Sequence, residues 1–252
     1  MQYRFALLVS LVLVLAACSD AGAETPDITT LPTTTSAATT PPTTTPTTTR
    51  PADLVPTSYP EFRAQATACD AEQPPPVEEM MFTAPTDMGV DKPVTVIIET
   101  SCGPVTVELD PAAAPQTVNS FVFLAEQGFF DGSASHRIIP GFVIQAGDPT
   151  ATGRGGPGYT LPDELPAADF TYARGTLAMA NAGPGTTGSQ FFIVVADVSL
   201  PPQFSVFGRV VDGFDVLGAI ERIDLGTAPG SRDPAPSTPL ESLYIERVEV
   251  SR

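Results

Sequence analysis

The sequence lacks residues that metal and nucleic-acid chemistry require. Its 252 residues contain no tryptophan, one histidine and three cysteines, which could fill one four-ligand zinc site only if every one of them were used, and we expect no zinc site. The 12 basic residues are outnumbered by 29 acidic ones, giving a net charge of −17. Nucleic acids and anionic membrane surfaces both attract a basic face, so we expect no nucleic-acid binding and no electrostatic docking on a membrane. Lys92 is the only lysine, so cationic chemistry must rest on arginine.

Motifs of nucleophilic and cofactor-dependent catalysis are missing as well. Serines and aspartates accompany the single histidine, His136, but no nucleophile-elbow motif supports a catalytic triad. No phosphate-binding loop pattern occurs, and the glycine-rich segment 153–158 is a poor match to nucleotide-binding fingerprints. No loop has the acidic spacing of a calcium site, although scattered carboxylates leave that alternative open. We expect no metal and no cofactor.

Long apolar runs are absent beyond the N-terminus, where Arg4 precedes an apolar run over residues 5–17. This run is shorter than the roughly 20 residues that span a bilayer, and it has the length of a signal-peptide core. The ending Leu-Ala-Ala-Cys at 15–18 resembles the bacterial lipobox, which implies a signal peptide over 1–17 and a lipid anchor on Cys18. We therefore expect an extracytoplasmic protein held on the cell membrane by lipid. An ordinary secretory signal with an incidental cysteine is the alternative.

Composition divides the rest of the chain into three parts. Most residues over 25–51 are threonine or proline, which predicts a disordered, extended tether. This tether belongs to a linker over 18–58. Residues 59–91 are expected to form an N-terminal arm that touches the domain, and residues 92–252 form the folded domain itself.

Two cysteines, Cys69 and Cys102, lie in the body of the chain. Lipidation would use Cys18 and leave this even pair. An oxidising compartment favours a disulfide between the two, which would pin the arm to the domain. Two unrelated buried thiols are the alternative.

Strand-like segments dominate the domain. All but the last of residues 94–99 are β-branched, and residues 105–109 alternate apolar and polar side chains as a half-buried strand does. Apolar residues at helical spacing predict a helix over 115–127, and a second short helix is expected over 214–223. Many short strands with two helices favour a mainly β fold, an antiparallel sandwich or barrel. Further strands are expected at 137–139, 142–145, 176–180, 191–195, 205–211 and 243–250.

Four separated blocks of sequence stand out in the domain. They are HRIIPGFVIQAGDP over 136–149, AMANAGP over 178–184, GSQFFI over 188–193 and VFGRV over 206–210. In content and order they resemble the signature of the cyclophilin family of peptidyl-prolyl cis-trans isomerases. The resemblance implies a closed eight-stranded antiparallel β-barrel capped by two α-helices. It also implies an enzyme that accelerates rotation about Xaa-Pro bonds in proline-containing polypeptides.

The resemblance implies a role for each matching residue. Arg137 stands at the family's catalytic arginine, whose guanidinium would stabilise the proline nitrogen of a twisted amide. Gln145 stands where a residue positions that arginine and the substrate backbone, and the main chain of Asn181 would bind substrate. His136 fits the edge of a pocket better than a proton donor, because the reaction transfers no proton. In addition to Asn181, the residues implied to bind substrate are His136, Phe142, Val143, Ala180, Gln190, Phe192, Leu200 and Phe204.

Each role has a structural alternative. The alternative for Arg137 is a surface arginine in an ordinary ion pair. The alternative for Phe142 and Phe192 is a place in the barrel core, the default location for aromatic residues in strands. The alternative for Gln145 and Asn181 is a structural role, in which their side-chain amides form hydrogen bonds with the backbone of loops.

The segment after the third block departs from the family. Leu200 stands where the family often has tryptophan or phenylalanine, and Pro201-Pro202 replace a common Leu-Asp. Phe204 stands at a position that is often histidine or tyrosine, and Ser135 replaces a phenylalanine before the first block. The missing tryptophan is expected to weaken cyclosporin binding more than catalysis.

Two other function classes remain beside the enzyme. A cyclophilin-like binding module would grip proline-containing segments with little turnover, and the altered segment 200–204 keeps that alternative open. A structural envelope lipoprotein would account for the tether but would leave the four blocks unexplained. The retained blocks favour the enzyme, and we expect a monomer.

Overall fold

The computed structural model describes residues 54–251, in which strands hold more residues than helices do. The signal peptide predicted over 1–17, the lipidation predicted at Cys18 and the tether up to residue 53 lie outside these described residues. Within the described part of the chain, no helix has the length and apolar character needed to cross a membrane.

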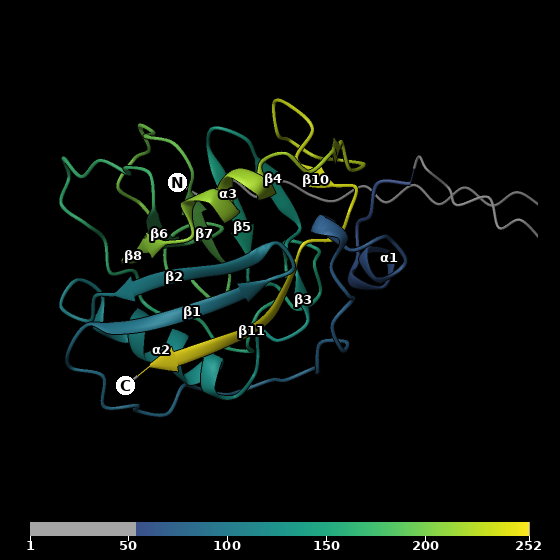
Figure 1. The fold of residues 1–252 in the computed structure, drawn as a ribbon. Helices are drawn as coiled ribbons and strands as arrows, with labels where there is room; N and C mark the ends of the chain where they lie inside the picture. The colour runs from purple at the N-terminus through teal and green to yellow at the C-terminus, as the bar shows by residue number, and fades with distance from the viewer. Residues whose placement is uncertain (1–53, 252) are drawn as a thin grey trace, which may run out of the picture. The chain divides into compact units, whose positions relative to one another are not determined.

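Nine strands form one antiparallel sheet that curls into a barrel (Figure 1). Their order across the sheet is β3-β11-β1-β2-β8-β6-β7-β5-β4. Two further short strands, β9 (Leu225–Gly226) and β10 (Thr238–Pro239), pair with each other. The sheet strands are β1 (Val94–Thr100), β2 (Gly103–Leu109), β3 (Ser133–Ala134), β4 (Arg137–Ile139), β5 (Val143–Ala146), β6 (Thr176–Met179), β7 (Phe191–Val194), β8 (Val206–Asp212) and β11 (Tyr244–Ser251).

A bent segment links the two edge strands of the sheet, β3 and β4, and accounts for the ninth strand. β3 pairs with β11 and β4 pairs with β5, and Ser135 and His136 alone separate β3 from β4. At the bend, the Ser135 amide donates to the Leu243 carbonyl at 2.8 Å, and the Ser135 hydroxyl donates to the Gln145 carbonyl at 2.7 Å. The predicted count of eight strands is therefore corrected to nine, because the bend interrupts one strand of the expected barrel.

Alternating apolar side chains fill the barrel interior. On β1 and β2, Val96 pairs with Val107 and Ile98 pairs with Val105, and all four side chains are buried. Residues between them face outward, as a period of two requires. Each such aliphatic side chain contributes about 1.5–3 kcal/mol when it is removed from water. The register of the barrel is therefore fixed by its core.

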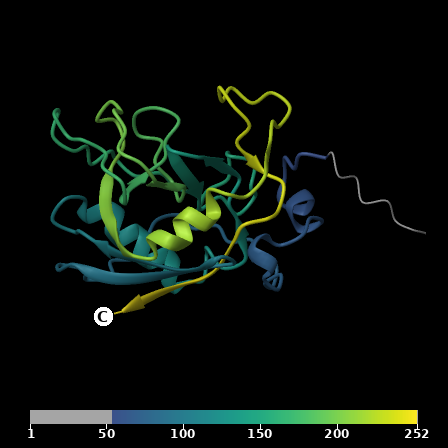
Figure 2. The ribbon, with the colours of Figure 1, turned by 45° about the horizontal axis from the view of Figure 1, so that its top comes forward.

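The two predicted helices are confirmed, as α2 (Pro115–Glu126) and α3 (Phe214–Ile220). α3 contacts β2, whereas α2 contacts β11 and β8, so the two helices lie at different places around the sheet (Figures 1 and 2). α2 begins with proline at its first position, where the missing N–H costs nothing. The carboxylate of Glu164 caps the same end by accepting the main-chain N–H groups of Gln116 and Thr117 at 3.0 and 2.8 Å. Phe121 of α2 packs against Phe207 in the barrel with ring centroids 5.2 Å apart.

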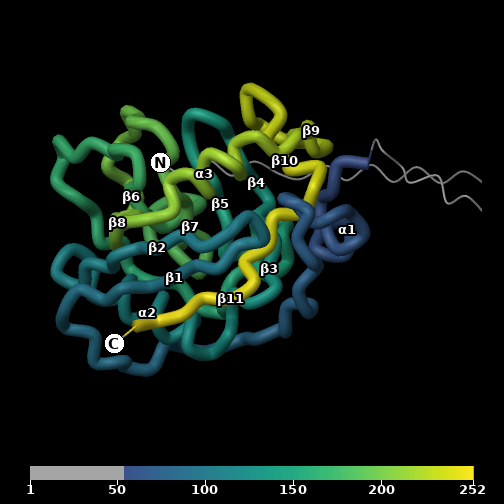
Figure 3. Tube along the Cα trace, viewed as in Figure 1, coloured from purple at the N-terminus to yellow at the C-terminus, as the bar shows by residue number. Residues whose placement is uncertain are grey.

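The segment 59–91, which is called the arm below, packs on the barrel. It contains α1 (Tyr59–Arg63) and a 3-10 turn (Ala68–Asp70), and it continues beside α2 to β1 (Figure 3). Phe62 is fully buried, and the Tyr59 hydroxyl donates to the Gly132 carbonyl at 2.8 Å. Further along, the ring of Phe82 meets Phe123 of α2 edge-on, with centroids 5.0 Å apart.

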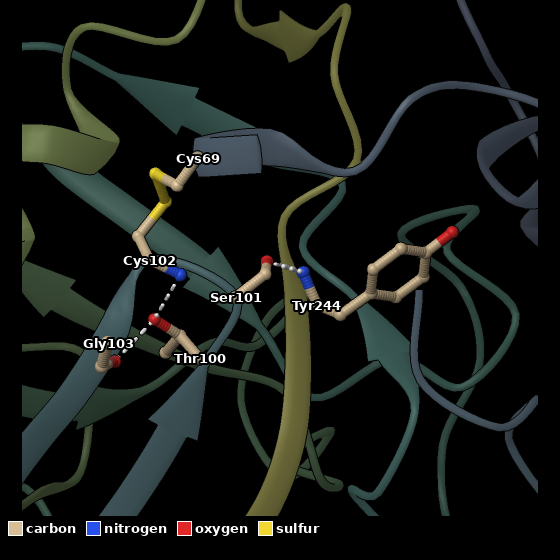
Figure 4. Close-up of a disulfide and its surroundings, with 6 residues drawn as sticks. All are labelled: Cys69, Thr100, Ser101, Cys102, Gly103 and Tyr244. Carbon is tan, nitrogen blue, oxygen red and sulfur yellow. Dashed lines mark hydrogen bonds between the residues drawn. A yellow bond between two sulfur atoms is a disulfide. The ribbon is translucent and has the colours of Figure 1, made fainter. Parts of the chain in front are cut away.

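A disulfide between Cys69 and Cys102 joins the arm to the turn between β1 and β2 (Figure 4). The two Cα atoms are 5.2 Å apart. The turn is held in addition by the Ser101 hydroxyl, which accepts the Tyr244 amide at 3.0 Å. The predicted disulfide is confirmed, and the alternative of two unrelated thiols is wrong.

Candidate active site

Strands β4, β5, β7 and β6 carry a row of side chains on the outer face of the barrel. Arg137 pairs with Gln145, and Gln145 pairs with Phe192. Phe192 in turn pairs with Ala178. Directly paired residues project from the same face of a sheet, so these four side chains lie in one row. Their sequence neighbours, such as Ile144, point into the barrel core instead.

Part of this row borders an apolar pocket of about 240 Å³. Leu200 and Phe204, from the segment between β7 and β8, form part of its wall. The pocket therefore combines one face of the sheet with the segment that departs most from the family pattern. It is lined by Arg137, Phe142, Val143, Gln145, Ala180, Asn181, Phe192, Leu200 and Phe204.

The apolar wall belongs to a side-chain cluster separate from the barrel core. Phe192 is buried in this second cluster, and Phe142 packs against it. The ring of Phe204 meets Phe192 edge-on at a centroid distance of 5.4 Å, and the Tyr172 hydroxyl donates to the Phe204 carbonyl at 3.2 Å. The interior of the barrel therefore does not account for Phe142 and Phe192, which line a pocket on its outer face.

Arg137 is held from two sides at the polar edge of the pocket. Its Nε and Nη2 atoms donate to the two carboxylate oxygens of Asp233 at 2.9 and 2.7 Å, and Nη1 donates to Gln145 Oε1 at 3.2 Å. These bonds use three of the five N–H donors of the guanidinium. The hydrogen bonds from Arg137 hold the pKa of Asp233 below its ordinary value, although burial opposes this. Two donors remain for a ligand in the pocket.

A chain of side-chain amides continues from the arginine. Gln145 Nε2 donates to Gln190 Oε1 at 3.0 Å, and Gln190 Nε2 donates to the Gly155 carbonyl at 3.0 Å. Gly155 is held in turn because its amide donates to the buried carboxylate of Asp148 at 3.1 Å. These hydrogen bonds are consistent with only one orientation of each side-chain amide, in which the oxygen of Gln145 faces Arg137.

Asn181 borders the same pocket with its main chain available. Its side chain is used internally: Nδ2 donates to the Gln203 carbonyl at 2.8 Å and Oδ1 accepts the Gly183 amide at 3.2 Å. No residue within 54–251 forms a hydrogen bond with the main-chain N–H or C=O of Asn181. The side chain thus positions the loop, and the backbone can bind an extended peptide.

His136 lies outside the residues that line the apolar pocket. Its Nδ1 atom is buried without a hydrogen-bond partner in the described chain. Burial lowers the pKa of His136 to about 4, and the nearby carboxylate of Asp148 only partly opposes this. A neutral, half-buried imidazole at neutral pH suits a packing role better than proton transfer.

A second, larger cavity of about 800 Å³ adjoins the apolar pocket. The two share Gln145, Ala180 and Asn181. Gln190 lines the larger one, together with the glycine-rich segment 153–158. No group of three or more His, Cys, Asp or Glu side chains within residues 54–251 is placed to hold a metal ion.

Comparison with known proteins assigns this geometry to a family. Residues 95–250 match the family described as cyclophilin type peptidyl-prolyl cis-trans isomerase/CLD. That segment is more than half of the chain. The chain belongs to the cyclophilin family. Its cyclophilin domain is 44% identical over 160 residues to the probable peptidyl-prolyl cis-trans isomerase B of Mycobacterium tuberculosis, covering 58% of this chain and 51% of that protein.

Other relatives are similar over nearly their whole length. The peptidyl-prolyl cis-trans isomerase-like 1 of Gibberella zeae is 42% identical over 160 residues, or 62% of this chain and 93% of that protein. A crystal structure of a Cryptosporidium parvum cyclophilin-type isomerase has a TM-score of 0.56 at 31% identity, covering 64% of this chain and 98% of that one. The chain spans about half the length of the mycobacterial relatives that it matches.

Sequence reasoning on the cyclophilin domain missed two features of the site. Asp233 lies 96 residues after Arg137 and outside the four blocks, so no local pattern links the two. The segment 153–158 looked like a poor nucleotide-binding loop, and it forms a wall of the larger cavity. The residues predicted for the site otherwise lie together, with His136 and Gln190 outside the apolar pocket.

Proposed function

We propose that this protein is a peptidyl-prolyl cis-trans isomerase that acts on Xaa-Pro bonds in exported polypeptides. The observation that carries the proposal is the placement of Arg137. Its guanidinium is held by Asp233 and Gln145 at the edge of an apolar pocket of about 240 Å³. A pocket with aromatic and aliphatic walls suits a proline ring, and the cation lies where the ring nitrogen would face the polar edge.

The reaction needs a site that prefers a twisted amide. Resonance opposes rotation about a peptide bond with a barrier of about 18–20 kcal/mol. At Xaa-Pro bonds the two planar isomers are close in energy, yet exchange takes tens to hundreds of seconds. Twisting breaks the resonance and returns a lone pair to the proline nitrogen. A donor that binds this lone pair stabilises the twisted state more than either planar one, which accelerates rotation in both directions.

The remaining site residues supply orientation. Gln145 holds Arg137 from the side opposite Asp233, and the main chain of Asn181 is available to pair with an extended peptide. The pocket holds the proline ring while the preceding carbonyl swings. No bond is made or broken, so a single preorganised cation is sufficient.

Related proteins support the proposed substrate class. One Cryptosporidium parvum cyclophilin-type isomerase structure, 32% identical with a TM-score of 0.56, was determined in the presence of the dipeptide Ala-Pro. We infer that the apolar pocket of this chain accepts the same kind of proline residue.

The test is isomer exchange in an Ala-Pro peptide by the wild-type protein and by Arg137→Ala. Loss of one charge-assisted donor to the reacting centre is expected to lower kcat/KM about 100-fold. Arg209→Ala is the matched control, because Arg209 is exposed and pairs with Glu108 on another part of the barrel. Equal rates for wild type and Arg137→Ala would overturn the proposal. Tight peptide binding without turnover would favour a binding module instead.

We also propose that the protein is exported and anchored to the cell membrane through lipid on Cys18. The apolar run ending at this cysteine supports the anchor, and the disulfide of the domain suits an oxidising compartment. Palmitate labelling of the intact protein is expected to disappear in Cys18→Ala. Labelling that persists in the variant would contradict the anchor and favour another site of modification.

A further inference from the structure

One apolar side chain at the larger cavity comes from outside the family-matched segment. The match begins at residue 95, whereas Met81 belongs to the arm and lines the cavity. Met81 is 69% exposed, more than Leu54, Leu165 or Val211, the other exposed large apolar residues of the described chain. An exposed apolar residue needs no explanation by itself. Here it lies at the rim of a cavity that adjoins the proposed proline pocket.

The backbone around Met81 is fixed. The next residue, Phe82, donates its amide to the Pro157 carbonyl at 2.7 Å and packs its ring against Phe123 of α2 and Phe129 just after that helix. The arm is held on either side of this point by the Cys69 disulfide and by the bond from the Met88 amide to Asn119 Oδ1 at 2.7 Å. Met81 is therefore presented at the cavity by a rigid segment.

The methionine faces a wall that is otherwise largely backbone. Its terminal methyl carbon lies 3.1 Å from the position that a Cβ on Gly158 would occupy. Pro157 and Tyr159 are the nearby apolar neighbours on that wall, while the glycines there expose peptide groups. A thioether side chain is flexible and unbranched, so it adapts to different apolar shapes.

The occupant of this cavity must lie close to the proline of a bound peptide. The larger cavity and the apolar pocket share Gln145, Ala180 and Asn181, so a single extended chain reaches both. Successive residues of an extended chain advance about 3.3 Å each, which places the occupant within a few residues of the proline.

We propose that Met81 is a specificity-determining residue that favours substrates with a large apolar side chain within a few residues of the proline. This inference rests on the proposed isomerase function. It assigns the arm a part in substrate selection, beyond its packing on the barrel. Met81 makes its contribution through contact with the substrate side chain and leaves the rotation step to Arg137.

The experiment compares peptides with an Ala-Pro core in which each flanking position carries leucine, phenylalanine, glycine or aspartate. Both kcat/KM and the dissociation constant are measured for wild type, Met81→Gln and Met81→Leu. Wild type is expected to favour the apolar peptides at one flanking position, and Met81→Gln to reduce that preference about fivefold. Met81→Leu is expected to retain it. Leu165→Gln is the control, because Leu165 is similarly exposed and lines neither cavity.

The outcomes separate this inference from the proposed function. An unchanged apolar preference in Met81→Gln, or an equal loss on every peptide, would overturn the role of Met81. Absence of turnover by wild type would overturn the isomerase function, while the ratios of dissociation constants would still decide what Met81 does. Thermal unfolding of the variants checks that the fold is intact. The melting temperature is expected to change little, because the substituted side chain is exposed.

Discussion

At the scale of single residues, the site depends on the side chains that hold Arg137 in place. Asp233 takes two of its N–H donors and Gln145 takes a third, so the guanidinium is fixed before a substrate arrives. The two side chains of the ion pair are 28% and 18% exposed, so water screens the pair only in part. A fixed cation loses little freedom on binding, which leaves more of its interaction for the twisted state. Asp233 is in this sense a positioning residue.

We expect Asp233→Asn to lower kcat about tenfold while KM changes little. An asparagine accepts one N–H bond where the carboxylate accepts two, and it loses the charge, which together weaken the hold on Arg137 by about 1.5 kcal/mol. Isomer exchange at several peptide concentrations separates the two constants. Glu108→Gln is the control, because it breaks the exposed pair with Arg209. An unchanged kcat in Asp233→Asn, with only a lower melting temperature, would show a purely structural pair.

The pH dependence of stability follows from His136. Its pKa in the folded protein is about 4, below the ordinary 6.5, chiefly because burial disfavours the imidazolium. Between these two pH values the unfolded chain binds a proton that the folded one does not. The stabilisation is therefore complete above pH 6.5 and is lost as pH falls towards 4, by about 3 kcal/mol.

His136→Asn is expected to remove this part of the pH dependence. Urea unfolding of wild type and variant at pH 7 and pH 4.5 measures it. His136 is the only histidine, so the difference between the two proteins belongs to this side chain. Parallel pH profiles for wild type and variant would contradict a half-buried, neutral His136.

At the scale of elements, the arm and the bend between β3 and β4 give this barrel its particular form. The bend carries Ser135, whose hydroxyl donates to the Gln145 carbonyl, and it directly precedes Arg137. The arm brings Met81 and Phe82 against the segment 153–158, so a part of the chain before the barrel shapes the larger cavity. Both features depend on contacts between segments that are distant in sequence.

Removal of the disulfide tests how the arm is anchored. The bond closes a loop with a sequence separation of 33 residues, which corresponds to about 3–4 kcal/mol of chain entropy in the unfolded state. The Cys69→Ser/Cys102→Ser double variant is expected to lose about that much free energy of unfolding, measured by urea denaturation without reductant. Addition of reductant should bring wild type to the same stability. An unchanged midpoint in the double variant would mean that packing alone holds the arm.

At the scale of the whole molecule, the net charge of −17 determines how charged substrates approach. A field of this sign attracts cationic peptides and repels anionic ones, and salt screens it over about 10 Å at 0.1 M. The charge therefore acts on the encounter rate, while rotation of the bound proline depends on the site alone.

We expect kcat/KM for a lysine-flanked Ala-Pro peptide to fall as ionic strength rises from 0.02 to 0.3 M, by roughly threefold. An aspartate-flanked peptide should show the opposite trend, and a neutral peptide should show neither. Isomer exchange measured across this salt series checks the expectation. The same trend for all three peptides would indicate an effect of salt on the protein rather than on the encounter.

The sequence by itself determined the elements that depend on local pattern. Alternating apolar residues predicted the strands, helical spacing predicted α2 and α3, and the four blocks predicted most of the pocket residues, because these signals are carried by neighbours in the chain. The tertiary structure alone decided the bend that adds a ninth strand, the pairing of Asp233 with Arg137 and the reach of Met81 to the larger cavity. Each of these joins segments far apart in sequence, where only folding fixes the distance between two side chains.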